Sequence, residues 1–174
     1  IKIFLLNAPE DHSYLVGLRT QLDILERKGI LDNWDNTEIK GGMVISDVIE
    51  ENLKEAEIFI PLVSADYLAS DKCQIIQKKA VELGKKILPV IVRDCLWDWD
   101  DDLTKHPVYP QKENGEVSPL SHWNQKGTAY RSIAEGIQKM LKSTSGRDRK
   151  NKENSAYGSR IMINNNQFNK EIAR

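Results

Sequence analysis

Cysteine, long apolar runs and net charge are all scarce in this sequence. Its two cysteines, Cys73 and Cys95, are too few for a disulfide framework and lack the spacing of metal ligands. No apolar run approaches the roughly 20 residues of a membrane-spanning helix, and the N-terminal residues do not resemble a signal peptide. The 25 basic and 26 acidic residues leave a net charge of -1, which gives no general attraction for nucleic acid. We therefore expect a cytoplasmic protein that binds neither membrane nor nucleic acid.

Short apolar runs alternate with amphipathic segments in the first half of the chain. The runs at 2–6, 30–34, 58–63 and 87–92 have the length of strands. Continuous apolar character at 58–63 and 87–92 is typical of parallel strands that are buried on both faces. Apolar residues at steps of three and four predict helices from Leu15 to a stop at Gly29, and over about 44–55, 71–83 and 128–141. A loop is predicted to begin at Ser64, and Asp71 with Gln74 forms a variant of the capping box that would open the helix at 71–83. This order predicts an α/β fold with an open, mostly parallel sheet and helices on both faces.

After residue 92 the alternation stops. Residues 93–127 predict a long connection, with a short helix near Trp97 and an edge strand at 117–120. Beyond the last predicted helix, the stretch STSGRDRKNKEN is polar and basic, which is the composition of a linker. We therefore predict one domain over residues 1–142, followed by a linker and the start of a C-terminal segment over 143–174.

The residues that follow the predicted strands exclude several domain families that commonly have this architecture. The first strand is followed by Asn7-Ala8-Pro9-Glu10 rather than the glycine-rich turn of a dinucleotide-binding domain. A phospho-receiver domain would carry an aspartate directly after the third strand, where this chain has Ser64. There is no P-loop motif either.

Acidic residues cluster at 98–102, with the sequence DWDDD. Such a cluster is compatible with a divalent ion, but a solvated acidic loop is the favoured interpretation. The three histidines are scattered without the spacing of metal ligands. We therefore expect no metal site.

Three spaced segments together carry a resemblance to a known family. They are KIFLLNAPED at 2–11, WDNTEIKGG at 34–42 before an amphipathic helix, and LVSADYLASDKC at 62–73. The later segments RDCLWDW and PLSHWN add to the match. In order and spacing the sequence resembles a TIR (Toll/interleukin-1 receptor) domain of the bacterial NAD+-hydrolase type over about residues 2–141.

This resemblance implies a flavodoxin-like three-layer sandwich with a five-stranded parallel sheet. It also implies one of two functions: some TIR domains are adaptors that associate with one another, whereas many bacterial ones hydrolyse NAD+ when clustered, in antiphage defence signalling. NAD+ would be the substrate, with no bound cofactor. The partners implied by the family are further copies of the domain and a C-terminal sensor or oligomerising domain.

The family's catalytic glutamate corresponds to Gln77 in this sequence, counted from Cys73. Cleavage of the nicotinamide–ribose bond builds positive charge on the ribose, which a fixed carboxylate stabilises. Loss of one preorganised electrostatic group typically costs on the order of 10² to 10³ in rate, so this form is expected to be weakened or inactive. Either Gln77 is native and the protein is a binding scaffold, or a glutamate has been replaced in a disabled enzyme. The isosteric residue and the otherwise intact motif favour the second.

Other candidate positions follow from the same resemblance. The implied substrate-binding residues are Asn7, Ala8, Trp34, Asp35, Ser64, Asp66 and Cys73, and the implied loop for gating and assembly contains Ile39, Lys40, Gly41 and Gly42. Ser64 and Asp66 equally fit an ordinary helix-entry turn, and Trp34 fits core packing. Cys73 fits a small buried apolar residue, since nothing nearby would activate its thiol. A flavodoxin-like domain unrelated to the TIR family stays open as a third interpretation.

Overall fold

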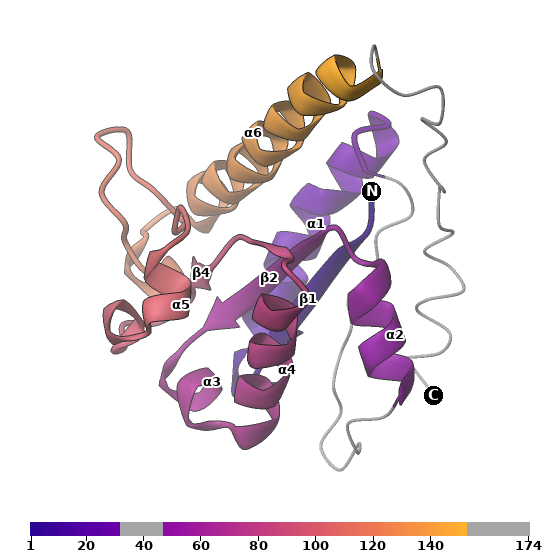
Figure 1. The fold of residues 1–174 in the computed structure, drawn as a ribbon. Coiled ribbons are helices and arrows are strands. Elements are labelled where there is room, and N and C mark those ends of the chain that lie inside the picture. The colour runs from indigo at the N-terminus through magenta and orange to yellow at the C-terminus, as the bar shows by residue number, and fades with distance from the viewer. Residues whose placement is uncertain (32–46, 153–174) are drawn as a thin grey trace.

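A parallel sheet forms the middle layer of the protein, and helices cover both of its faces (Figure 1). The structure is a computed structural model that describes residues 1–31 and 47–152. Strand β1 (Ile3–Asn7) pairs in parallel with β2 (Ile58–Val63) along its whole length. On the other side of β2 lie β3 (Lys86–Ile87) and β4 (Val90–Ile91), also parallel to it. The α/β class predicted from the alternation of segments is thus confirmed.

Strands β3 and β4 are two pieces of the single strand predicted at 87–92. Between and after them the backbone keeps its bonds to β2, because Leu88 N donates to Phe59 O at 3.0 Å and Val92 N donates to Val63 O at 2.9 Å. Pro89 has no N–H and interrupts the regular ladder between the two pieces.

The described residues contain four strands, where five were expected. Ile30 and Leu31 lie outside any strand, and the rest of the predicted strand at 30–34 falls outside the described residues. The predicted edge strand at 117–120 is wrong. Val117 makes one isolated antiparallel bridge to Gln111, and Leu120–His122 forms the 3-10 helix η3. Pro119 lies between these two features and cannot donate to a ladder.

Side chains that alternate along β1 and β2 divide the core into two layers. All residues of both strands are buried, as expected for a sheet covered on both faces. One layer packs Ile3, Leu5, Ile58 and Ile60 against α1 (His12–Arg27) and α6 (Lys126–Lys152). The other packs Phe4, Leu6, Phe59 and Val63 against α2 (Asp47–Glu55) and α4 (Asp71–Glu82). Helices α1 and α6 lie side by side on the first face (Figure 1).

The helices α1, α2 and α4 match their predicted positions, and α1 ends before Gly29, whose φ is +70°. The remaining short elements are η1 (Pro9–Asp11), α3 (Ala65–Ala69), η2 (Trp97–Trp99) and α5 (Asp101–Thr104). The last two account for the short helix expected near Trp97.

Three details of the helices differ from the prediction. Residues after Ser64 form the short helix α3 instead of a loop. Asp71 was expected to cap α4 together with Gln74, but the cap is Ser70, whose hydroxyl accepts from Cys73 N at 3.3 Å. Helix α6 continues to Lys152, beyond both its predicted end at 141 and the predicted domain boundary at 142. Helical structure therefore includes part of the stretch whose composition resembled a linker.

Candidate functional site

Two groups of polar side chains meet at the carboxyl ends of the strands, which is the edge where parallel α/β sheets carry their sites. The first, which we name the arginine cluster, consists of Asp11, Ser64, Asp66 and Arg93. The second, named the glutamine cluster, consists of Tyr67, Gln77 and Asp100. Helix α3 connects them, because it contributes Asp66 to one and Tyr67 to the other.

In the arginine cluster, one guanidinium group joins two carboxylates. Arg93 Nε donates to Asp11 Oδ1 at 2.9 Å, and Arg93 Nη2 forms an ion pair with Asp66 Oδ2. The hydrogen bond that Arg93 donates to Asp66, and next the one that it donates to Asp11, raises the pKa of Arg93. The two carboxylates differ in burial, since Asp11 is 0% exposed and Asp66 is 41% exposed. A charge-paired cluster therefore ties the ends of three strands together.

Ser64 has both a structural and a bridging role. Its hydroxyl donates to Asp11 Oδ2 and accepts from the backbone N–H of Tyr67 at 3.2 Å, which caps α3. The helix-entry interpretation of Ser64 is thus seen directly. Asp66 and Ser64 are brought together as expected, but through Arg93 and Asp11, which the list of candidate residues did not contain.

In the glutamine cluster, protein partners occupy both ends of the Gln77 amide. Tyr67 Oη donates to Gln77 Oε1 at 2.8 Å, and Gln77 Nε2 donates to Asp100 Oδ2 at 2.9 Å. A carboxylate only accepts hydrogen bonds, so the amide nitrogen must face Asp100 and the oxygen must face Tyr67. Gln77 itself is 3% exposed, on the same face of α4 as Cys73, Ile76 and Ala80.

Tyr67 stays protonated over the ordinary pH range. Burial raises its pKa well above the usual value, and the nearby Cys73 and Asp100 raise it further. Its hydroxyl therefore remains a donor to Gln77 and fixes the orientation of the amide.

Asp100 is the most accessible member of the glutamine cluster. Its side chain is half-buried and caps α5, with Oδ1 accepting from Asp102 N at 3.0 Å and from Leu103 N at 3.2 Å. Among the side chains that the structure describes, no lysine or arginine forms an ion pair with Asp100. The interpretation of residues 98–102 as a solvated acidic loop is wrong for Asp100, because Gln77 and the α5 backbone hold it in place.

Of the remaining predicted site residues, three are buried and the others lie outside the residues that the structure describes. Asn7 is buried, with Nδ2 donating to Ala8 O at 2.9 Å and Oδ1 lacking a partner within the described residues. Ala8 and Cys73 are also buried, and burial raises the pKa of the Cys73 thiol. Six candidates lie outside the described residues: Trp34, Asp35, Ile39, Lys40, Gly41 and Gly42.

The list of candidate residues from the sequence missed four members of the two clusters, namely Asp11, Tyr67, Arg93 and Asp100. Arg93 had a usable signal, since it is the basic residue directly after the buried strand 87–92. Asp100 lay in an acidic run whose members looked equivalent in sequence. Only the fold distinguishes it from exposed neighbours such as Asp98.

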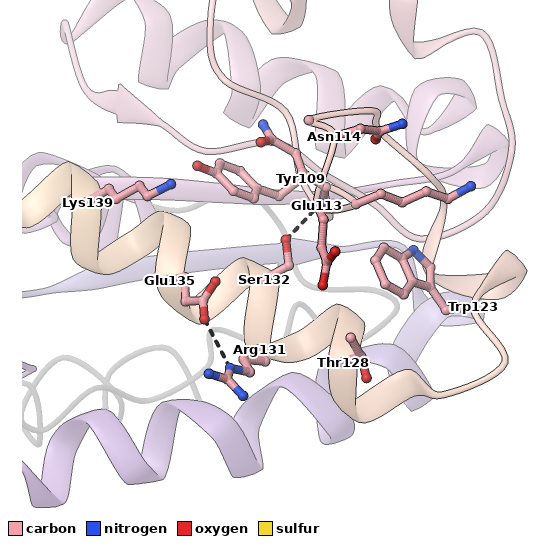
Figure 2. A pocket seen from close by; sticks show the side chains of 12 residues that line it. Tyr109, Glu113, Asn114, Trp123, Thr128, Arg131, Ser132, Glu135 and Lys139 are labelled. Carbon is pink, nitrogen blue, oxygen red and sulfur yellow. Dashed lines mark hydrogen bonds and ion pairs between the residues drawn. The ribbon is translucent and has the colours of Figure 1, made fainter.

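A separate pocket of about 870 Å³ lies between α6 and the loop 109–115 (Figure 2). Gln111 N donates to Ser132 Oγ at 2.9 Å across it, and Arg131 pairs with Glu135 at 3.0 Å on α6. No residue of either strand-end cluster lines this pocket, and its charged side chains are of both signs. It therefore provides no clear preference for a charged ligand.

Neither a metal centre nor a membrane span is found in the part of the chain that the structure describes. No group of three or more histidine, cysteine, aspartate and glutamate side chains there is arranged to hold a metal ion. No helix there is both long and apolar enough to cross a bilayer.

The family follows from a comparison of the sequence with known domain families. The sequence model of the TIR domain matches residues 3–126, and the chain belongs to this family. This membership excludes the interpretation as a flavodoxin-like domain unrelated to TIR proteins.

Individual relatives are more distant. The uncharacterized protein y4lF of Sinorhizobium fredii is 26% identical over 141 residues, which are 78% of this chain and 42% of that protein. The chain thus spans about two fifths of the length of this curated relative. Among solved structures, the TIR domain of the Toll-related receptor TRR-2 from Hydra magnipapillata has a TM-score of 0.45 at 18% identity, with 78% of this chain and 97% of that one covered. The CMP N-glycosidase BcmB of Clostridium botulinum has a TM-score of 0.47 at 17% identity, with 76% and 98% covered.

Proposed function

We propose that this TIR domain is an NAD+ glycohydrolase weakened at Gln77, which acts on self-association in bacterial defence signalling. The products would be nicotinamide and ADP-ribose, linear or cyclic. The observation that carries the proposal is the position of Gln77 at the strand-end edge, within hydrogen-bond distance of a carboxylate. Membership of the TIR family supplies the reaction class.

An unpartnered acceptor near the end of β1 adds support. Asn7 Oδ1 is buried and has no hydrogen-bond partner among the described residues. Buried polar atoms in folded proteins are nearly always paired, so such an atom suits a hydroxyl group of a ligand. A nucleotide substrate provides such hydroxyls on its ribose rings.

A second function, a non-catalytic scaffold that acts through TIR–TIR contacts, is favoured by a different observation. The Gln77 amide has protein partners at both ends, Tyr67 and Asp100, and only 3% of the residue is exposed. An amide satisfied in this way needs no substrate to complete it. In this case Gln77 is a native structural residue.

Nicotinamide release from NAD+ separates the two functions. The chain is compared with Gln77→Glu, each at high concentration and with a crowding agent to drive association, and the product is quantified by chromatography. Gln138→Glu, on α6 and outside both clusters, is the matched control for the same chemical change. The enzyme proposal expects Gln77→Glu to raise the rate by on the order of 10² or more, with no change from Gln138→Glu. If Gln77→Glu releases no nicotinamide in the associated state, the scaffold function replaces the enzyme.

A further inference from the structure

Asp100 lies next to the position where a TIR hydrolase would need its carboxylate. We propose that Asp100 is a catalytic residue that supplies, from the neighbouring position, the negative charge that Gln77 lacks. The inference rests on the proposed NAD+ hydrolysis and names the group that performs it in this chain.

The charge of Asp100 is available, whereas the charges of the two aspartates in the arginine cluster are not. Asp11 and Asp66 both bind Arg93, so their negative charge is offset locally. Asp100 has no such cation among the described side chains. Its partners are neutral N–H donors, which orient a carboxylate without cancelling its charge.

The carboxylate is also held in place before any substrate arrives. Gln77 Nε2 fixes Oδ2, while the backbone of Asp102 and Leu103 fixes Oδ1. Tyr67 in turn orients the Gln77 amide from the buried side. Preorganised charges stabilise a transition state better than mobile ones, because they need no reorganisation during the reaction. Gln77 is thus a positioning residue for Asp100, which is itself only half-buried.

The reaction balances with water as the only co-reactant. The bond between the ribose carbon and the pyridinium nitrogen breaks, and its electron pair leaves with nicotinamide, which becomes neutral. Positive charge develops on the ribose opposite the Asp100 carboxylate. Water then bonds to the ribose carbon and loses one proton, to Asp100 or to solvent, which leaves ADP-ribose.

Asp100→Asn tests the charge while it retains hydrogen-bonding capacity. An asparagine oxygen can still cap α5, and its amide can donate to Gln77 Oε1 if the Gln77 amide turns over. Asp98→Asn is the matched control. Asp98 is exposed, and its substitution removes the same charge two residues away. Asp100→Ser, a neutral residue that also caps helices, serves if the asparagine variant does not fold.

Nicotinamide release is measured under clustering conditions for the natural chain, Asp100→Asn, Gln77→Glu and the double variant. We expect Asp100→Asn to lower the rate of the natural chain by on the order of 10² or more, and Asp98→Asn to change it less than about twofold. In the Gln77→Glu background, Asp100→Asn should cost less than about fivefold, since the glutamate then carries the charge. Such non-additivity identifies two groups that perform one role.

The outcomes separate this inference from the function on which it rests. If Gln77→Glu is active but the natural chain is no faster than Asp100→Asn, the role of Asp100 is overturned and the hydrolase stands. The same conclusion follows if Asp100→Asn slows both backgrounds equally, because Asp100 then acts only as a structural cap. If neither the natural chain nor Gln77→Glu releases nicotinamide, the hydrolase itself is excluded.

Discussion

The arginine cluster and the glutamine cluster share one edge of the sheet but handle charge in opposite ways. In the first, Arg93 is bonded to Asp11 and Asp66, so ionised groups neutralise one another. In the second, the only ionised side chain is Asp100, and its partners are an amide and backbone N–H groups. One cluster is therefore a connection between strand ends, and the other holds a carboxylate that pairs with no cation among the described side chains.

This difference indicates where stability and where function reside. Removing a buried hydrogen-bonding group destabilises the folded protein, because the buried partners that it leaves lose their hydrogen bonds. An uncompensated carboxylate contributes less to stability but is suited to interact with a cationic group. Mutations in the arginine cluster should therefore act mainly on folding, and mutations at Asp100 mainly on activity.

Removal of the buried carboxylate should have the largest effect on stability. Asp11→Ala deprives Arg93 and the buried Ser64 hydroxyl of their shared acceptor, and we expect it to lower the free energy of unfolding by about 2 to 3 kcal/mol. Chemical denaturation of both proteins measures this. Asp66→Ala is the control within the same cluster, since its ion pair is about 40% exposed on both sides and should cost about 1 kcal/mol or less. Equal losses of stability would contradict the distinction between the buried carboxylate of Asp11 and the exposed carboxylate of Asp66.

The hydroxyl of Tyr67 should come next. Tyr67→Phe leaves Gln77 Oε1 buried without a donor, at a cost of about 1 to 2 kcal/mol in unfolding free energy. Tyr130→Phe is a suitable comparison, because Tyr130 is also buried but none of the described hydrogen bonds uses its hydroxyl. If urea titrations show the same loss of stability in both variants, the Tyr67–Gln77 hydrogen bond makes no net contribution to the free energy of unfolding.

High pH should affect the glutamine cluster through the same tyrosine. The raised pKa of Tyr67 means that its stabilising protonated form is fully present below the unfolded value of about 10, and is lost as pH rises toward the folded value. Above pH 10 the natural chain should lose about 1.4 kcal/mol of stability per pH unit more than Tyr67→Phe does. Denaturation curves at pH 9, 10 and 11 test this, and parallel losses for the two proteins would refute it.

The smallest effect concerns the two thiols, whose reactivity measures how accessible the strand-end region is in the native protein. Burial raises the pKa of both Cys73 and Cys95, but Cys73 is 4% exposed and Cys95 is half-buried. A thiol-specific chromogenic reagent should therefore modify Cys95 slowly in the native protein and Cys73 only on unfolding. Cys95→Ser should leave no native reactivity. Rapid modification of that variant would show that the α4 face opens more readily than its packing indicates.

Local sequence pattern sufficed for most of the elements. The apolar runs at 58–63 and 87–92 and the helix at 71–83 were predictable because burial on both faces or on one stripe dictates which residues are apolar. The edge strand at 117–120 and the cap of α4 were not, since they depend on competition between neighbouring groups. Ser70 outcompeted Asp71 as the cap, while the Gln74 amide turned to the carbonyl of Tyr67.

The candidate site divides in the same manner. Sequence placed Ser64 and Asp66 at the strand-end edge, because they directly follow a buried strand, and the family resemblance added Gln77. It did not identify the partners of these residues, since Arg93 is 82 positions from Asp11, and Asp100 is 23 positions from Gln77.

By itself, the sequence determined the α/β class, the family and the neutral residue at position 77. These properties depend on residue type and spacing, which a chain carries whether or not it is folded. Only the tertiary structure decided that one aspartate of an acidic run faces Gln77 while another stays exposed, because such contacts form between segments that the fold alone brings together. The charge balance of the edge is a property of those contacts.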